Sequence, residues 1–351
     1  MANLFQAVLC FSIMLQWPLL SFGETNHRPH DKKMIIIVNS YSHEYLATKR
    51  QQKGFEKAFF DKISRDKYLF VTFNLRSKKT QKKILERNVE RTKQIVFKKN
   101  PVAIFVTDDY AFKHFYPLAK ANNIPLVFSG INANLCDYGY TPGEKGISGT
   151  LERYNYLAIL RLFKILKPKT IRNILVVADD DITGNFLIKD FLKNTSPSAI
   201  ADIGVKVSIL KTTQFHTLTE KIKSVDPIDT GLFYLVVYAQ RDQNNQAIPT
   251  TKIDKWIFEN TNHIDVGLTA AHVQAGRLMS LASNMYESGV FAGQILARSL
   301  LEKKDLNKFP IREKLPLEFR LNRSRAKKLN LKMPFKFLVY EKLTSRHYKG
   351  E

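Results

Sequence analysis

Short polar runs directly follow several apolar segments of this chain. Val102–Val106 is followed by Thr107–Asp109, and Pro125–Phe128 is followed by Ser129–Asn132. The hydroxyls, carboxylates and amide of these runs are groups that hold a small ligand through hydrogen bonds and charge. Open α/β sheets bind ligands outside the carboxyl ends of their strands, where backbone N–H groups and helix N-termini are unpaired. The pattern therefore predicts a small-molecule cleft.

The paired carboxylates Asp108 and Asp109 have two interpretations. Both open a predicted helix, where a carboxylate complements the positive end of the helix dipole. Alternatively, one of them holds the ammonium group of a ligand. Acid–base catalysis is the weakest interpretation, because the sequence places no nucleophile beside the pair.

The first apolar strand ends in a similar polar segment, Asn39–Tyr45. Ser40 and Tyr41 there offer hydroxyl groups and an aromatic wall to a ligand. The alternative for this segment is that Ser42 simply caps the following helix, as serine often does. Gly130, in the later Ser129–Asn132 run, lets the backbone approach a ligand closely, although a plain turn would also explain it.

Gln240 and Arg241 follow the predicted strand Gly231–Ala239, and the arginine is suited to pair with a ligand carboxylate. The run Asp179–Asp181 lacks the spacing and the terminal Glu of a calcium loop, so we expect a solvated loop there. The predicted ligand-binding residues are Ser40, Tyr41, Thr107, Asp108, Asp109, Ser129, Gly130, Asn132, Gln240 and Arg241.

Motifs of the common enzyme classes are absent from the sequence. The chain has no G-x-S-x-G, no G-x-x-x-x-G-K-[ST], no H-E-x-x-H, and no G-x-G-x-x-G after the first strand. Its 8 histidines lie singly, without metal-ligand spacing. We therefore expect a binding protein with no catalytic residues, no metal and no cofactor.

Strands and helices alternate along the chain with short connections, which predicts a doubly wound α/β architecture. Two such units follow one another. We expect an N-terminal lobe from 33–150 plus 277–322, a C-terminal lobe from 151–276, and an extension, 323–351, that packs on the lobes. Several chain crossings would form a hinge, and hinged lobes close around a ligand.

The composition limits the compartment and the partners. Residues 1–23 are apolar, contain no Lys, Arg, Asp or Glu, and resemble a signal peptide cleaved before Glu24, although an uncleaved membrane anchor is the alternative. Removal would leave 351 − 23 = 328 residues with one cysteine, Cys136, and hence no internal disulfide. The net charge of +23 favours anionic partners. Because the lysines and arginines are dispersed, we expect solvated surfaces and no nucleic acid partner.

Several segments together resemble the ABC-transporter substrate-binding-protein-like family. They are N-S-Y-S-H-E-Y, T-D-D-Y-A-F, V-F-S-G-I-N, I-S-G-T-L-E-R, L-K-P-K-T-I and the C-terminal L-E-F-R-L-N-R-S-R-A-K-K-L-N-L-K-M-P. The resemblance covers nearly all of the chain after residue 23. It implies the type I periplasmic binding protein fold, with two lobes and a ligand held between them. The N-S-Y and D-D-Y-A-F forms look closest to the branch that also occurs as extracytoplasmic sensor domains.

The resemblance implies an exported, periplasmic or secreted protein that delivers a solute to an ABC permease, and we expect a monomer. Signalling to a membrane receptor kinase or cyclase is the alternative, and an enzyme on the same scaffold is a third. Asn132–Leu135 stands where many transport relatives have an Asp-Pro pair. The ligand is therefore left open, with an amino-acid-like molecule as one candidate.

Overall fold

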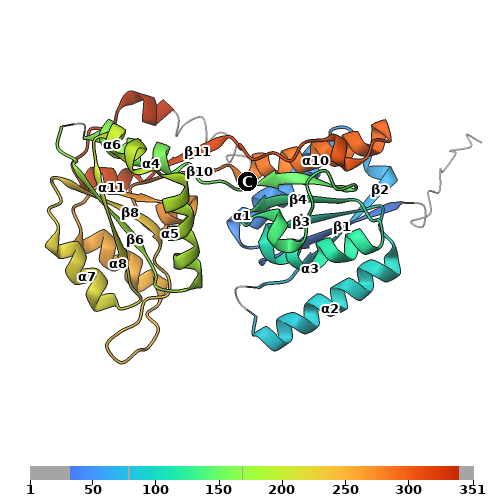
Figure 1. Cartoon of the computed structure of the whole chain (residues 1–351), viewed down its shortest axis with the longest axis horizontal. Coiled ribbons are helices and arrows are strands. Elements are labelled where there is room, and N and C mark those ends of the chain that lie inside the picture. The colour runs from blue at the N-terminus through green and yellow to red at the C-terminus, as the bar shows by residue number, and fades with distance from the viewer. Residues whose placement is uncertain (1–31, 78–79, 168, 340–351) are drawn as a thin grey trace, which may run out of the picture.

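The chain folds into two α/β lobes joined by several crossing segments (Figure 1). The structure is a computed structural model that describes residues 32–77, 80–167 and 169–339. The predicted signal peptide lies outside the described residues. Within them, no helix is long and apolar enough to cross a membrane.

The first lobe is built on a parallel sheet of five strands in the order β2-β1-β3-β4-β5. The strands are β1 (Lys33–Asn39), β2 (Tyr68–Asn74), β3 (Ala103–Thr107), β4 (Leu126–Ile131) and β5 (Ile147–Leu151). Four long helices cover it: α1 (Leu46–Phe60), α2 (Lys82–Lys99), α3 (Asp108–Ala121) and α10 (Met285–Glu302). The short helices η2 (Arg65–Lys67), η3 (Leu135–Tyr138) and η4 (Leu306–Lys308) lie in its connections.

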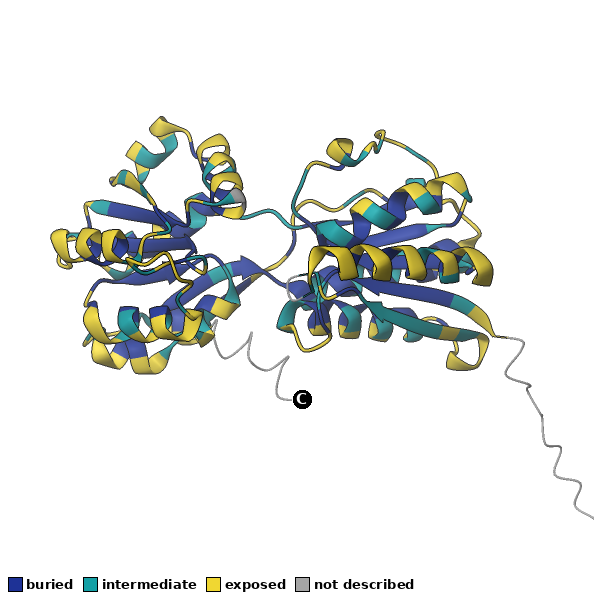
Figure 2. Cartoon of the chain, turned by 90° about the horizontal axis from the view of Figure 1, so that it is seen from below, coloured by how far each residue is buried: buried dark blue, intermediate teal, exposed yellow. Residues whose placement is uncertain are grey.

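The alternation of side chains along β1 explains why this strand is apolar throughout. Ile36 and Val38 enter the core beneath α2 and α3, whereas Ile35 and Ile37 enter the core beneath α1 and α10. Successive side chains of a strand point to opposite faces, so a strand with helices on both faces must be apolar at every position. Figure 2 shows these strands as buried, between helices with exposed outer faces.

The second lobe contains a sheet of six strands in the order β11-β10-β9-β8-β6-β7. The strands are β6 (Asn173–Ala178), β7 (Lys206–Lys211), β8 (Thr230–Val236), β9 (Asp265–Gly267), β10 (Met279–Ser283) and β11 (Leu317–Leu321), and only β11 pairs antiparallel. Its helices are α4 (Tyr156–Leu166), α5 (Ile182–Asn194), α6 (Pro197–Ile203), α7 (Phe215–Ser224), α8 (Thr250–Asn260), α9 (Ala270–Gln274) and α11 (Arg323–Lys328).

The prediction for segment 277–322 is wrong for its two strands. We expected the whole segment in the first lobe, but β10 pairs with β9 and β11 pairs with β10, so both extend the second sheet. The helices between them do pack on the first lobe: α10 against α1, β4 and β5, and η4 against β5. An apolar pattern predicts a strand but does not indicate which sheet the strand joins. Here β10 pairs with the open edge of β9, and β11 then pairs with β10.

Helices α1 and α10 approach so closely that glycine is required between them. A Cβ atom at Gly289 would lie 1.9 Å from the Gln51 carbonyl oxygen, and one at Gly54 would lie 2.2 Å from the Tyr286 carbonyl oxygen. Both distances are far below van der Waals contact. The two glycines thus allow the backbones to touch.

The start of the C-terminal extension packs on the second lobe. Arg325 of α11 is fully buried, and its guanidinium donates to both carboxylate oxygens of Asp265 and to carbonyl oxygens of the segment 258–263. Phe337 stacks on Phe319 of β11 with ring centroids 4.9 Å apart. The described part of the extension therefore completes the second core.

Candidate functional site

Three crossing segments join the lobes, and we call them together the hinge. They are 151–155, which leads from β5 to α4; 283–285, which leads from β10 to α10; and 310–316, which leads from η4 toward β11. Backbone hydrogen bonds tie them in pairs: Leu151 N–H donates to the Arg312 carbonyl and Asn284 N–H to the Pro316 carbonyl, each at 2.9 Å. Both sheets direct polar residues toward this hinge.

Two of the predicted residues, Ser40 and Thr107, are fully buried. The Ser40 hydroxyl donates to the Thr107 carbonyl at 2.6 Å and accepts from the Ala111 N–H at 2.8 Å. The Thr107 hydroxyl donates to the Asn39 side chain at 3.1 Å. These hydroxyls hold the ends of β1 and β3 and the first turn of α3 together, so they position the site.

Tyr41 and Asp108 lie at the carboxyl ends of β1 and β3. Burial raises the pKa of Tyr41 well above its usual value, and the nearby Asp108 carboxylate raises it further. Asp108 is 5% exposed and has φ +60°, a left-handed conformation that Asp tolerates better than most residues. Such conformations cost energy and concentrate at ligand-binding and active sites.

Asp109 organises the loop that follows β4. Its carboxylate accepts the N–H groups of Asn132 at 3.1 Å and Ala133 at 3.0 Å, together with the Tyr138 hydroxyl at 3.1 Å. Burial, assisted by this carboxylate, raises the pKa of Tyr138. Asp109 therefore acts on the site through the loop.

Ser129 and Gly130 face α10 across the end of β4. The Ser129 hydroxyl lies 2.7 Å from the Ser288 hydroxyl, which in turn lies 2.5 Å from that of Thr150. Gly130 has φ +75°, and a Cβ atom there would lie 2.3 Å from the Gln51 amide nitrogen. Both residues serve the close packing of the first lobe.

Asn132 links this loop to the first crossing. Its amide nitrogen donates to the Glu152 carboxylate at 3.2 Å, while its buried side-chain oxygen has no hydrogen-bond partner among the described residues. The Arg153 guanidinium donates to the carbonyls of Ile131, Asn132 and Glu152 at 2.8–3.1 Å. The buried acceptor is thus the side-chain oxygen of Asn132, whose amide nitrogen bonds to the Glu152 carboxylate of the hinge.

Gln240 is buried inside the second lobe, where its side chain bonds to two other segments. It is 1% exposed, and its amide donates to Asp179 at 2.6 Å and to the Thr212 carbonyl at 2.7 Å. The Asp179 carboxylate also accepts the N–H groups of Tyr238 and Ala239 at 2.6 and 2.9 Å. Burial outweighs these bonds and raises the pKa of Asp179. This arrangement fixes the segment after β8, which carries Tyr238.

Arg241 is exposed and bonded within its own loop. Its guanidinium donates to the Asn245 carbonyl at 2.8 Å, and its backbone forms bridges with Gln214 and Ala247. The structure therefore engages Arg241 within its own loop.

Tyrosines missing from the sequence prediction lie around the hinge. The Tyr45 ring packs edge-on against Tyr41 with centroids 5.0 Å apart. Burial raises the pKa of Tyr154, as do Glu152 and the neighbouring tyrosines Tyr156, Tyr45 and Tyr41. Burial also raises the pKa of Tyr238 in the second lobe, and among lesser causes Tyr45 acts on it. Aromatic residues thus follow β1 in the first lobe and β8 in the second, and one lies in the first crossing.

Tyr238 rests on a buried histidine. Its ring stacks on His272 with centroids 5.5 Å apart and planes at 21°. Burial lowers the pKa of His272 to about 3, and Arg277 contributes to the shift. The predicted strand Gly231–Ala239 included Tyr238, whereas β8 ends at Val236 and leaves Tyr238 in the segment that follows.

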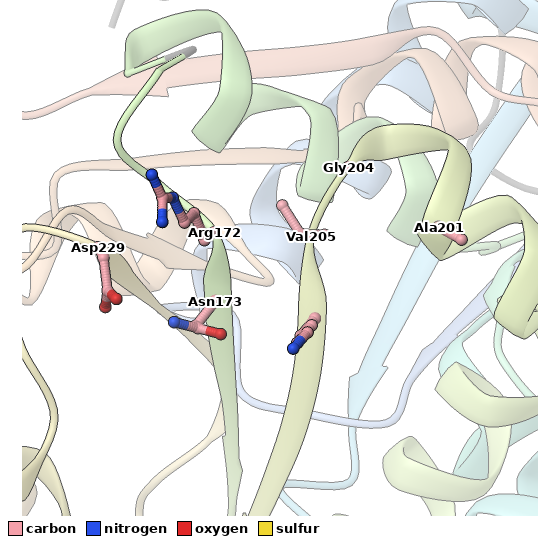
Figure 3. Close-up of a pocket in the computed structure, with 7 residues that line it drawn as sticks. Arg172, Asn173, Ala201, Gly204, Val205 and Asp229 are labelled. Atoms are coloured by element: carbon pink, nitrogen blue, oxygen red, sulfur yellow. The ribbon is translucent and has the colours of Figure 1, made fainter.

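Two surface cavities of the described residues are lined by none of these tyrosines. One, of about 450 Å³, is at the opposite edge of the second sheet, where Arg172 and Asn173 begin β6 and Gly204 and Val205 precede β7 (Figure 3). The other, of about 590 Å³, runs along α10. Among the described residues no group of three potential metal ligands occurs.

The comparisons with known proteins identify the fold. A ligand-free, open substrate-binding protein with adhesive properties from Clostridium difficile superimposes with a TM-score of 0.68 at 19% identity, covering 86% of this chain and 96% of that one. An ABC domain in complex with L-Trp from Streptococcus pneumoniae gives 0.64 at 14% identity, with 88% and 98% covered. The fold is that of a type I periplasmic binding protein.

Regulators of transcription share this fold. A putative LacI transcriptional regulator from Bacteroides fragilis superimposes with a TM-score of 0.56 at 11% identity, covering 84% of this chain and 98% of that one. No sequence profile of a known family matches the chain, and no curated protein matches it in sequence. The shared fold alone thus leaves open which function the two lobes serve.

Proposed function

We propose that the protein is an extracytoplasmic solute-binding protein that captures a small molecule between its lobes and delivers it to an ABC transporter. The observation that supports this proposal is the placement of aromatic residues at the strand ends of both lobes and between them: the packed pair Tyr41 and Tyr45 after β1, Tyr154 in the first crossing, and Tyr238 after β8. Residues from both lobes favour the closed state only when a ligand bridges them.

The charges around Tyr41 support a ligand with an ammonium group. Asp108, Asp109 and Glu152 all act on its phenol, and each raises its pKa. A cation is attracted to carboxylates and to the faces of aromatic rings. An amino-acid-like solute fits this arrangement, with its ammonium near Asp108 and its side chain among the tyrosines.

A titration with L-amino acids tests the capture step. We expect an aromatic amino acid to raise the melting temperature and to compact the protein in small-angle scattering. At a ligand concentration a hundred times the dissociation constant, the stabilisation amounts to roughly 2.7 kcal/mol. Tyr45→Ala should weaken binding roughly fivefold, because an aromatic contact contributes about 1 kcal/mol.

Phe97→Ala provides the matched control. Phe97 is an aromatic residue of α2 in the same lobe and is 67% exposed. Its removal should leave affinity unchanged. Equal affinities of wild type, Tyr45→Ala and Phe97→Ala for the same ligand would exclude Tyr45 from the site.

The Asp108→Ala variant separates ligand binding from helix capping. A contact with a ligand ammonium predicts a loss of affinity, whereas a capping role predicts a loss of about 1 kcal/mol of stability with affinity retained. Calorimetric titration with the identified ligand distinguishes the two. Unchanged affinity would leave Asp108 as a cap.

Delivery to a permease is the further step of this proposal. The protein would act after export, as a monomer, and without catalysis. Cells lacking the protein should lose uptake of the identified ligand and regain it on complementation. Normal uptake with an altered transcriptional response to the ligand would favour the sensor role instead.

A further inference from the structure

A groove of about 590 Å³ lies on the first lobe beside the hinge. One wall is α10, which lies on the top of that lobe in Figure 1, and the other is the segment 309–314, which includes the first part of the third crossing. The apolar part of its lining is formed by Phe291 and Ile295 from α10 and by Phe309 and Ile311 from the opposite wall. Such a surface excludes water and favours the apolar part of a ligand.

Two arginines stack on the aromatic walls of the groove. The guanidinium carbon of Arg312 lies 3.5 Å from the ring centroid of Phe291, and that of Arg298 lies 5.1 Å from the centroid of Phe309. Arg298 also donates through Nε to Glu302 at 3.1 Å, which uses one of its five N–H donors. Stacking fixes the guanidinium planes beside apolar surface, where they can bind a carboxylate with two parallel hydrogen bonds.

The lining carries a positive excess. Arg298, Arg312 and Lys314 face a single acidic residue of the lining, Glu313. A positive groove with apolar walls complements a molecule that combines an apolar body with one negative charge.

Backbone hydrogen bonds of Arg312 also connect the groove to the first crossing of the hinge. The Arg312 N–H donates to the Gly149 carbonyl at 2.9 Å, and the Arg312 carbonyl accepts the Leu151 N–H at the same distance. Leu151 ends β5 and begins the first crossing, so Arg312 is tied to two of the three crossings. A molecule that contacts Arg312 therefore contacts a segment that must adjust when the lobes move.

We propose that this hinge groove is a second ligand site, which binds a small apolar monocarboxylate and shifts the equilibrium between the lobe arrangements. The site is separate from the tyrosine-lined region and does not depend on the function proposed above. A ligand shifts such an equilibrium only through different affinities for the two arrangements. The backbone bonds of Arg312 provide a physical basis for that difference.

Three probes of equal chain length test the ligand class. Decanoate, decan-1-ol and decyltrimethylammonium are titrated calorimetrically into the full chain below their micelle-forming concentrations. We expect decanoate to bind at one site, decanol at least tenfold more weakly, and the cation not at all. Decanol binding as tightly as decanoate, or no saturable decanoate binding, would overturn the proposal.

Substitutions that each remove one positive charge test where decanoate binds. Arg312→Gln and Arg298→Gln should each weaken decanoate binding roughly tenfold, whereas Arg298→Lys should retain part of the affinity. Lys308→Gln is the control, because Lys308 is an exposed cation of η4 outside the lining. Equal effects of the three glutamine variants would show a general charge effect and refute the site.

Small-angle scattering tests the connection to the hinge. Saturation with decanoate should change the radius of gyration of the wild type but not that of Arg312→Gln at the same concentration. Full occupancy with an unchanged scattering profile would refute the effect on the lobes.

Discussion

His272 makes the stability of this protein depend on pH in a way that can be calculated. The side chain is 2% exposed and lies under the Tyr238 ring. Its Nδ1 accepts the N–H of Thr269 at 3.3 Å, which places the proton of the neutral ring on Nε2. Burial and Arg277 lower its pKa to about 3, against about 6.5 in the unfolded chain.

The direction of this pH dependence follows from the number of protons that the folded and unfolded states bind. Between pH 6.5 and about 3 the unfolded chain binds a proton at this residue and the folded chain does not, so acidification favours unfolding. From pH 7 to pH 5 the loss from His272 alone is about 2 kcal/mol, and it hardly depends on the folded pKa as long as that value is well below 5.

The variant His272→Gln removes the titration while preserving the local structure. Thr269 and His272 form a capping box at the start of α9. Glutamine commonly occupies the position of His272 in this motif and makes the same backbone hydrogen bond.

Urea denaturation of both proteins at pH 7 and pH 5 is the assay. We expect the free energy of unfolding to fall by about 2 kcal/mol more in the wild type than in His272→Gln. His263, whose pKa is also lowered by burial, acts equally in both proteins and cancels. Identical losses on acidification would show that His272 titrates normally and that the ring is accessible to water.

Three further substitutions test the packing around the site. Arg325→Met should cost about 3–5 kcal/mol of unfolding free energy in urea, because the Asp265 carboxylate stays buried without its partner; a cost below 1 kcal/mol would contradict this. Gly289→Ala should lower the melting temperature through a clash with the Gln51 carbonyl that costs on the order of 3 kcal/mol, and an unchanged melting temperature would show that the helices can separate freely. Asp109→Ala leaves three donors without their acceptor, so we expect a cost of roughly 2 kcal/mol and faster hydrogen exchange at residues 132 and 133, which unchanged exchange would refute.

The parts of the fold that depend on local pattern could be read from the sequence. The first apolar strand of the sequence is β1, which ends at Asn39, where the polar segment begins, because a continuous apolar run of this length is typical of a strand buried on both faces. The two-lobe parallel architecture follows from the alternation of such runs with helices, and the structural comparison confirms it. The sequence could not indicate which sheet β10 and β11 join, because that depends on which sheet has an unpaired edge strand within reach in the folded chain.

The sequence indicates where strands end, but the role of each side chain at those ends depends on the folded structure. The ends of β1, β3 and β4 were located by their polar runs, and these ends do gather beside the hinge. Residue type does not reveal where a hydroxyl points, and that of Ser40 is used within the first lobe. The sequence did not single out Tyr45 and Tyr238, because a tyrosine in or near an apolar strand also fits ordinary core packing.

The crossing chain has a consequence for how this protein comes to be folded. Arg50 of α1 forms a buried bidentate ion pair with Glu318 of β11, 268 residues later in the sequence, and α10 covers α1 from a similar distance along the chain. A newly made first lobe therefore lacks one covering helix until nearly the whole chain has emerged. The apolar surface of the first lobe therefore stays exposed for most of synthesis. Contacts between residues so far apart in the sequence also form slowly. An exported version of this chain would thus suit transport in the unfolded state, with both lobes completed together on the far side of the membrane.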